Sequence, residues 1–256
     1  MKTKSLLIKL SKFFPKKIAE KTDYVGLMCG NLPENVNKIL LCLDYDEFVY
    51  KYVENFKPDI VITHHPFIYG SLNKVLKEDE NKRILYEKML KVNIPVYSFH
   101  TNFDEGKNGM NDALATALDL KDIVPLTTFP MARGGRLPIA MTYDELAKYV
   151  MNKLNVPYCL KLNYGKKEIS KIAIVGGGGW FAYKNAMLEK YDCFISGDIP
   201  HHGRREILLD KFNYIDIPHE VERIFMKQMK KVLLNINANL NILTIDHEKE
   251  PEILFK

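Results

Sequence analysis

The stretch Asp59-Ile-Val-Ile-Thr-His-His-Pro66 decides the fold of this chain. Its apolar run is continuous rather than alternating, which predicts a strand covered by helices on both faces, as in parallel or mixed sheets. Similar runs recur on either side of it, at Ile39–Leu43, Pro95–Phe99, Ile172–Val175, Asp192–Ser196 and Tyr214–Ile217. Segments with apolar residues at helical spacing separate these runs, such as Asp79–Val92 and Asn111–Leu118. The sequence therefore predicts an α/β protein.

The length of the chain, 256 residues, is enough for two modest lobes. The clearest break is Pro125–Pro138, a segment with prolines and glycines and no periodicity. We predict a first α/β lobe over residues 1–125, completed by residues from about 226 to 256, and a second over 126–225. The lobes are expected to be interlinked, with mixed sheets covered by helices.

Composition excludes several classes of protein. With 46% hydrophobic and 27% charged residues the chain is ordinary globular material, and no stretch approaches the roughly 18 apolar residues of a membrane span. The spacing of Leu6, Leu7, Leu10 and Phe13 predicts an amphipathic helix that packs on the protein's own core, with a membrane surface as the alternative. The four cysteines are scattered without a CxxC pair, which favours reduced thiols and a cytoplasmic location.

The net charge of +5 invites a nucleic-acid interpretation. The basic residues are dispersed over predicted helix surfaces with acidic residues between them, and no nucleic-acid-binding motif is present. Nucleic acid is therefore a disfavoured partner that stays open as an alternative.

Metal-capable residues and glycines follow the predicted strands at their carboxyl ends, where ligands bind in open α/β sheets. These groups are His64 and His65, His100 to Asp104, Gly176–Gly179, Asp198 with His201 and His202, and His219 to Glu222. Six of the seven histidines lie in such positions, and only His247 stands apart.

Imidazole and carboxylate groups are ligands for Zn, Mn, Fe and similar ions. His64 and His65 stand at a strand end before a proline, where the chain can turn and direct the two rings to different ions. Asp104 could then bridge, and two ions about 3.5–4 Å apart can activate a water and stabilise a developing oxyanion.

Each group also has an interpretation without chemistry. The His-His pair can be a solvated surface feature, His100 with Asp104 a hydrogen-bonded loop pair, and His219 with Glu222 a helix start. The glycine run can be a tight strand-to-helix turn or a phosphate-binding turn, and Asp198 can cap the next segment.

Taken together, these segments resemble the Nif-three-like family of dinuclear-metal proteins, whose members carry the name GTP cyclohydrolase I type 2 homologue. The matching segments are Asp23-Tyr-Val-Gly-Leu-Met-Cys-Gly30, Thr63-His-His-Pro-Phe67, His100-Thr-Asn-Phe-Asp104 with Gly109-Met-Asn-Asp112, Gly176–Gly179, Ser196-Gly-Asp198 with His202, and Tyr214-Ile-Asp-Ile-Pro-His219. They span most of the chain.

The resemblance implies a site at the strand carboxyl ends between the lobes that holds two divalent metal ions, of Zn, Fe, Mn, Co or Ni. Its ligands would be His64, His65, Asp104, His219 and a glutamate after His219. The family places that glutamate four residues on, where this chain has Arg223, so we assign the role to Glu222, which shares a helical face with His219, rather than to Glu220. His100, Asn102, His202 and Asp198 are expected near the metals.

Two functions follow from these observations. The first is a metal-dependent hydrolase acting on a small anionic substrate, phosphorylated or nucleotide-like, with His100 and Asp104 as catalytic residues. The second is a non-catalytic metal-binding ring that serves regulation, metal handling or nucleic-acid binding. The resemblance also implies a homo-hexamer built as a trimer of dimers.

Overall fold

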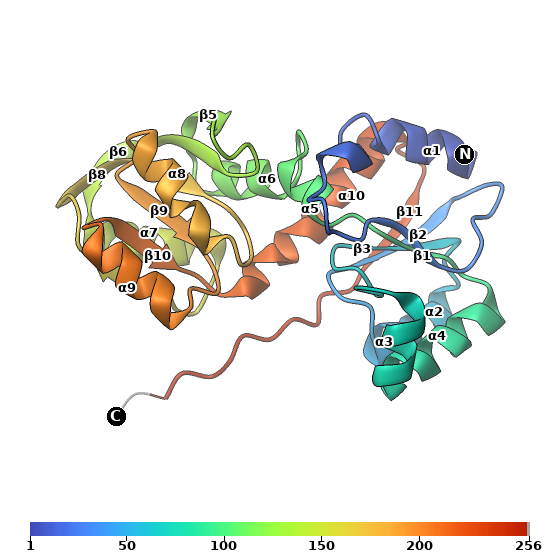
Figure 1. Cartoon of the computed structure of the whole chain (residues 1–256). Helices are drawn as coiled ribbons and strands as arrows, with labels where there is room; N and C mark the ends of the chain where they lie inside the picture. The colour runs from blue at the N-terminus through green and yellow to red at the C-terminus, as the bar shows by residue number, and fades with distance from the viewer. Residues whose placement is uncertain (255–256) are drawn as a thin grey trace. The chain divides into compact units, whose positions relative to one another are not determined.

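The computed structural model describes residues 1–254, which fold into two compact units. The first unit comprises Met1–Gly109 and Phe225–His247, and the second comprises Met110–Ile224 and the segment from Glu248 onward. Both units contain a mixed sheet with helices (Figure 1). The predicted α/β class with mixed, helix-covered sheets is therefore confirmed.

The sheet of the first unit has the strand order β1-β4-β3-β2-β11. Its strands are β1 (Gly26–Cys29), β2 (Lys38–Cys42), β3 (Ile60–Thr63), β4 (Val96–Ser98) and β11 (Asn241–Thr244). All neighbours pair in parallel except β1 with β4. The carboxyl ends of four strands therefore meet at one edge, where the predicted histidines follow.

Helices cover both faces of this sheet (Figure 1). The helices α2 (Glu47–Phe56), α3 (Leu72–Glu78) and α4 (Glu80–Val92) lie on one face, and α1 (Thr3–Leu10) and α10 (Ile224–Ile236) lie on the other. Every residue of β3 is buried, as the continuous apolar run predicts. Leu6 and Leu10 of α1 are fully buried, so the N-terminal helix packs on the protein's own core.

The sheet of the second unit has the order β5-β6-β8-β9-β10-β7. Its strands are β5 (Lys121–Pro125), β6 (Arg133–Thr142), β7 (Leu160–Asn163), β8 (Glu168–Ile174), β9 (Cys193–Ser196) and β10 (Asn213–Asp216). Strands β8, β9 and β10 are parallel, and the other pairs are antiparallel. The glycine run and the His219 segment follow β8 and β10, so they lie at the same edge of this sheet.

The second unit also contains α-helices and short 3₁₀ turns. They are α6 (Met110–Ala117), α7 (Tyr143–Leu154), α8 (Tyr183–Leu188) and α9 (His201–Leu209), with the 3₁₀ turns η2 (Trp180–Ala182) and η3 (His219–Arg223). Helices α8 and α9 pack on the face that contains Ala173, Phe194 and Tyr214. Thr142 and Glu145 form a capping box that fixes the start of α7.

The division between the units differs from the predicted one at residue 125. Residues 110–125 form α6 and the edge strand β5, which pairs with β6 of the second sheet. The segment Pro125–Pro138 is therefore a hairpin within one sheet rather than a linker between lobes. The return to the first unit falls at Phe225, and the segment from Glu248 onward belongs to the second unit instead of the first.

No helix within residues 1–254 combines the length and the apolar character needed to cross a bilayer.

Candidate metal centre

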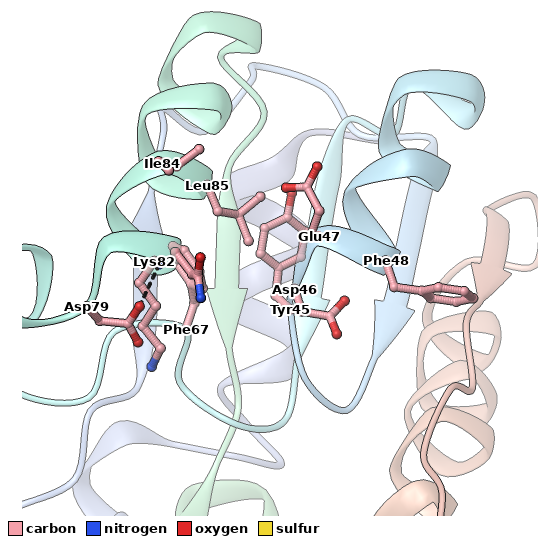
Figure 2. A pocket seen from close by; sticks show the side chains of 10 residues that line it. Tyr45, Asp46, Glu47, Phe48, Phe67, Asp79, Lys82, Ile84 and Leu85 are labelled. Atoms are coloured by element: carbon pink, nitrogen blue, oxygen red, sulfur yellow. Dashed lines mark hydrogen bonds between the residues drawn. The ribbon is translucent and has the colours of Figure 1, made fainter.

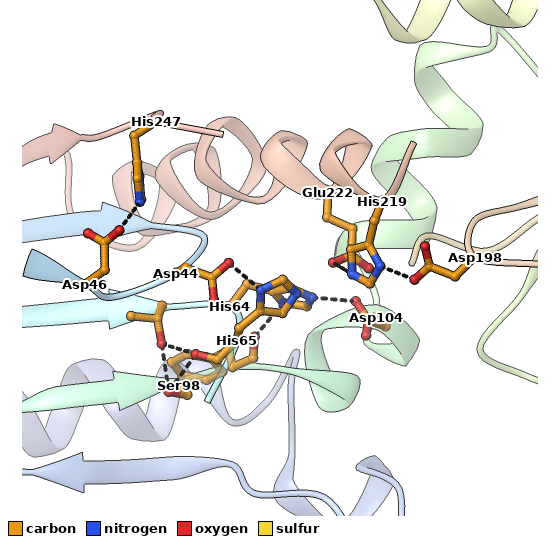
Figure 3. A network of polar contacts seen from close by, with 12 residues as sticks. Asp44, Asp46, His64, His65, Ser98, Asp104, Asp198, His219, Glu222 and His247 are labelled. Carbon is orange, nitrogen blue, oxygen red and sulfur yellow. Dashed lines mark hydrogen bonds and ion pairs between the residues drawn. The ribbon is translucent and has the colours of Figure 1, made fainter. Parts of the chain in front are cut away.

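The turn after β3 holds His64 and His65 in different directions. The backbone N–H groups of both residues donate to the carbonyl of Leu43, at 3.2 and 3.1 Å. The hydroxyl of Thr63 bonds the carbonyl of His65 at 2.8 Å and the hydroxyl of Ser98 at 2.7 Å. These bonds end the strand and separate the two rings, which lie 5.0 Å apart at 46° (Figure 3).

Hydrogen bonds at Nδ1 fix the tautomers of both rings. His64 Nδ1 lies 2.9 Å from the carbonyl oxygen of Phe99, and His65 Nδ1 lies 2.7 Å from Asp44 Oδ2 (Figure 3). A carbonyl or carboxylate oxygen only accepts, so Nδ1 carries the proton in each ring and Nε2 carries the lone pair. An acceptor on one ring nitrogen with the other turned toward the ion is the usual arrangement of a metal-binding histidine.

His100 repeats this arrangement at the end of a second strand, β4. It precedes α5 (Thr101–Glu105), and its Nδ1 lies 2.7 Å from Asp23 Oδ1. Thr101 donates to the other oxygen of Asp23 through both its backbone N–H and its hydroxyl. Burial alone would raise the pKa of Asp23, but the bonds from His100 and Thr101 outweigh it and lower the pKa to about 2. Asp23 is therefore an ionised acceptor that holds His100 in place.

The structure brings the three histidines of the first unit together. His64, His65 and His100 offer ligand atoms that all lie within 4.8 Å of one another. Asp104, 7% exposed on α5, places Oδ1 3.6 Å from His64 Nε2 (Figure 3). Asn102, on the same helix, is buried, and its side-chain amide donates to the backbone carbonyl of Phe14 at 2.9 Å. Neutral imidazole nitrogens beside a carboxylate suit a divalent transition metal.

The second unit presents a different group of ligands after β10. His219 begins η3, where its Nε2 lies 3.1 Å from Glu222 Oε2 and its Nδ1 lies 2.5 Å from Asp198 Oδ2 (Figure 3). The three-residue spacing thus places Glu222, rather than Glu220, against the ring of His219. Arg223 pairs with Glu250 at 2.9 Å and makes no part of this group.

The glycine run provides the space for Glu222. Gly177 has φ +62°, and a Cβ there would lie 2.4 Å from Glu222 Oε1. A Cβ on Gly176 would lie 3.4 Å from the same oxygen. Glu222 itself is 3% exposed, so its carboxylate is seated in the turn. The turn after β8 is therefore the tight turn of the simpler interpretation, and a carboxylate already occupies the place where a phosphate would bind.

The charges of this second group favour a cation. The bond to Glu222 raises the pKa of His219 to about 9, against the effect of burial, and the negative charges of Glu222 and Asp198 add to the rise. Burial raises the pKa of nearby Asp216 to about 6. A metal ion at His219 requires the neutral imidazole, so binding there would exchange a proton for the ion.

Two of the histidines that follow β9 belong to none of the possible ligand groups among the described residues. His201 and His202 begin α9 and are exposed, and His202 packs edge-on against Trp180. Conversely, His247 does not stand apart: it follows β11, bonds Asp46 at 3.0 Å and stacks on Phe48. Sequence reasoning did not predict that three acidic residues accept hydrogen bonds from histidines, namely Asp44, Asp46 and Asp23. The signal for Asp44 and Asp46 was available, because they follow β2 as the histidines follow β3.

The fold and these groups define a class of protein: a two-unit α/β protein with candidate metal ligands at the carboxyl ends of both sheets. The chain belongs to the Duf34/NIF3 (NGG1p interacting factor 3) family, whose model matches residues 1–251. The resemblance seen in the sequence is thereby confirmed.

Known relatives cover nearly the whole chain. A protein of Campylobacter jejuni named GTP cyclohydrolase 1 type 2 homolog is 30% identical over 96% of this chain and 97% of its own length. A protein of Methanocaldococcus jannaschii with the same name is 30% identical over 96% of this chain and 100% of its own. The crystal structure of a hypothetical protein from Staphylococcus aureus superposes with a TM-score of 0.89 at 24% identity, covering 100% of this chain and 99% of that one. That likeness concerns the fold.

Proposed function

We propose that this protein holds two divalent metal ions and hydrolyses a small anionic molecule, phosphorylated or nucleotide-like. The observation that carries the proposal is the orientation of three histidines in the first unit. Each has Nδ1 on an oxygen acceptor, which leaves the lone pair of Nε2 available to a metal ion.

The proposed ligands are His64, His65, Asp104, His219 and Glu222. The first three belong to the first unit, and His219 and Glu222 belong to the second. His64 and His65 offer neutral nitrogens, and the two carboxylates offset the charge of the ions.

The chemistry divides between the ions and the side chains. Two bound ions would lower the pKa of a water and stabilise the developing oxyanion. His100 moves the proton at Nε2, because Asp23 holds its Nδ1 and stabilises the protonated ring. Asp104, buried beside His64, keeps the ligand geometry and is the second catalytic residue. The name of the relatives makes GTP one substrate to include in any panel.

Metal analysis and a substrate panel test this proposal. We expect about two transition-metal ions per chain after purification with metal supplied, and hydrolysis of a member of a panel of phosphoesters and nucleotides that includes GTP. His65→Ala should lose at least one ion and the hydrolytic activity together, because the ring supplies a ligand that alanine lacks. His201→Ala, an exposed histidine outside both groups, is the matched control and should keep both.

Two outcomes would change the proposal. Less than about half an ion per chain with metal supplied would exclude the dinuclear centre. About two ions without hydrolysis of any panel member would favour the non-catalytic ring instead. The homo-hexamer, a trimer of dimers, stays a prediction that light scattering on the purified protein can measure.

A further inference from the structure

A cavity of about 620 Å³ lies in the first unit between the starts of α2 and α4 (Figure 2). One wall is the segment Tyr45–Phe48, which follows β2, and the opposite wall is Asp79–Leu85 at the start of α4. The volume falls in the range of pockets that bind small molecules. None of the proposed metal ligands lines it.

The inner part of the cavity is apolar and aromatic. Tyr45, Phe67 and Leu85 are 6%, 4% and 5% exposed, and the rings of Tyr45 and Phe67 meet edge to face at 5.4 Å. Ile84, at the mouth, leaves 40% of its surface exposed although it is a large aliphatic residue. Such walls favour a flat ring system over water or a flexible polar chain.

The polar groups of the cavity are mostly hydrogen-bond acceptors. Asp46, Glu47 and Asp79 contribute carboxylates, whereas Lys82 is the one cationic side chain and Asn81 the one amide among the lining residues. Asp79 caps α4 by accepting from the Lys82 backbone, and Glu47 pairs with Lys88 at 2.7 Å. Each carboxylate oxygen has two lone pairs, so acceptor capacity remains after these bonds. The cavity therefore suits a ligand that brings N–H donors.

The cavity shares a loop with the candidate metal centre. Asp44 holds His65, and Asp46, two residues on, lines the cavity and bonds His247 after β11. Strand β2 has β3 on one side and β11 on the other, with α2 and α10 on opposite faces of the sheet. The carboxyl end of β2 is thus the point where the winding of the sheet reverses, which is where ligands bind in open α/β sheets.

We propose that this cavity binds the non-reacting part of the substrate, a flat heterocyclic ring that bears amino groups, while the anionic part of the same molecule is directed to the histidines. The ring stacks against the aromatic floor, and its amino groups donate to the carboxylates at the rim. The assignment of a substrate rests on the proposed function, whereas binding of the ring does not require metal.

Binding of nucleosides to the full-length, metal-stripped protein tests the cavity separately from the chemistry. Adenosine and cytidine carry exocyclic amino groups and uridine does not, and none of the three carries a phosphate. By calorimetry or ligand-detected NMR, we expect adenosine and cytidine to bind about tenfold more tightly than uridine, which corresponds to roughly 1.4 kcal/mol.

Two variants locate the binding. Ile84→Trp fills the mouth and should weaken adenosine binding by at least about tenfold. Val92→Trp is the matched control, because Val92 is on the same helix, is 41% exposed and lies outside the cavity, so binding should not change. Asp79→Asn keeps the helix cap but removes the charge, and should reduce the preference for adenosine over uridine.

The proposal is overturned if the metal-stripped protein binds none of the nucleosides, if uridine binds as tightly as adenosine, or if Ile84→Trp binds like Val92→Trp. The metal content of the same preparations, measured before stripping, reports on the metal centre independently. If no nucleoside binds but the protein holds about two ions per chain, the cavity proposal is wrong and the proposed function is unaffected.

Discussion

The two candidate ligand groups are built on the same plan and differ in charge. In the first unit, three imidazoles each have an oxygen acceptor at Nδ1, so each ring is oriented before any ion arrives. In the second unit, one imidazole stands between two carboxylates, and its pKa is raised to about 9, chiefly by Glu222. The first group is a set of pre-oriented imidazoles, and the second is a single imidazole that holds its proton between two carboxylates.

This difference shows how a mildly basic chain can attract cations. The formal net charge of +5 counts each carboxylate as one negative charge wherever it lies, including those of Glu222 and Asp198. Glu222 is instead buried in a glycine turn, where its charge is screened less by solvent. We infer that the first unit supplies most of the imidazole ligands, whereas the second places one imidazole between two carboxylates. Substitutions that affect one group alone can separate these contributions.

The largest expected effect comes from filling the turn that holds Glu222. Gly177→Ala places a Cβ 2.4 Å from Glu222 Oε1 at φ +62°, so both crowding and backbone strain oppose it. We expect a loss of about 2–4 kcal/mol in the free energy of unfolding. Urea denaturation measures this loss, and metal analysis should show fewer ions per chain.

The adjacent glycine is the control for this substitution. A Cβ on Gly178 would lie 3.5 Å from Asp198 Oδ2, an ordinary contact, and its φ is not positive. Gly178→Ala should therefore cost little stability and keep the metal. Equal losses in the two variants would show that the turn is sensitive as a whole and that Glu222 has no special place in it.

A smaller effect is expected from the acceptor that orients His65. Asp44→Asn keeps an oxygen for His65 Nδ1 but removes the charge, which should weaken metal binding by about 10–100-fold. Burial raises the pKa of Asp44, but the bond and charge of His65 outweigh it and the net shift is downward, so the carboxylate is ionised at neutral pH.

Asp59→Asn is the matched control in the first unit, because Asp59 lies at the opposite end of β3 and accepts from the backbone N–H groups of Asn37 and Lys38. It should leave the metal dissociation constant unchanged. If titration with a competing chelator gives the same constant for both variants and the unchanged protein, orientation by Asp44 contributes nothing to metal binding.

Much of this arrangement is predictable from local sequence. Continuous apolar runs mark β3, β9 and β10, and the ligand residues directly follow the strands. The resemblance implied a glutamate after His219, and the three-residue spacing on a helical turn then favoured Glu222 over Glu220. Patterns of this kind depend on a few neighbouring residues, and the sequence displays them in full.

The partners of these ligands and the division of the chain depend on pairing over long distances. His100 and Asp23 are separated by 77 positions, and nothing near either residue indicates the other. Strand β5 was missed because it is an exposed edge strand with a register shift, and its assignment to the second unit depends on pairing with β6. The short strand β11 was missed likewise, so His247 looked isolated although β11 joins the sheet beside β2.

The smallest expected effect concerns pH and a carboxyl group of the second unit. Burial raises the pKa of Asp216 to about 6, and the nearby charge of Asp198 adds to the rise against a backbone bond from Ile199. Between about pH 4 and 6 the folded protein holds a proton that the unfolded chain has lost, so stability falls as pH rises through this window and levels off above it. The first unit contrasts with this, because Asp23 has its pKa lowered and loses its contribution only in strong acid.

Asp216→Asn should therefore stabilise the metal-stripped protein at pH 7.5 by about 1–2 kcal/mol, somewhat less than the full shift implies because Asp216 keeps contact with solvent. The asparagine oxygen can still accept from the Ile199 N–H, so packing changes little. Near pH 4 the two proteins should unfold with the same free energy, since both then carry a neutral side chain. Urea denaturation at pH 4, 6 and 7.5 measures the difference. A gap that is as large at pH 4 as at pH 7.5 would mean that the charge of the buried Asp216 is not its source.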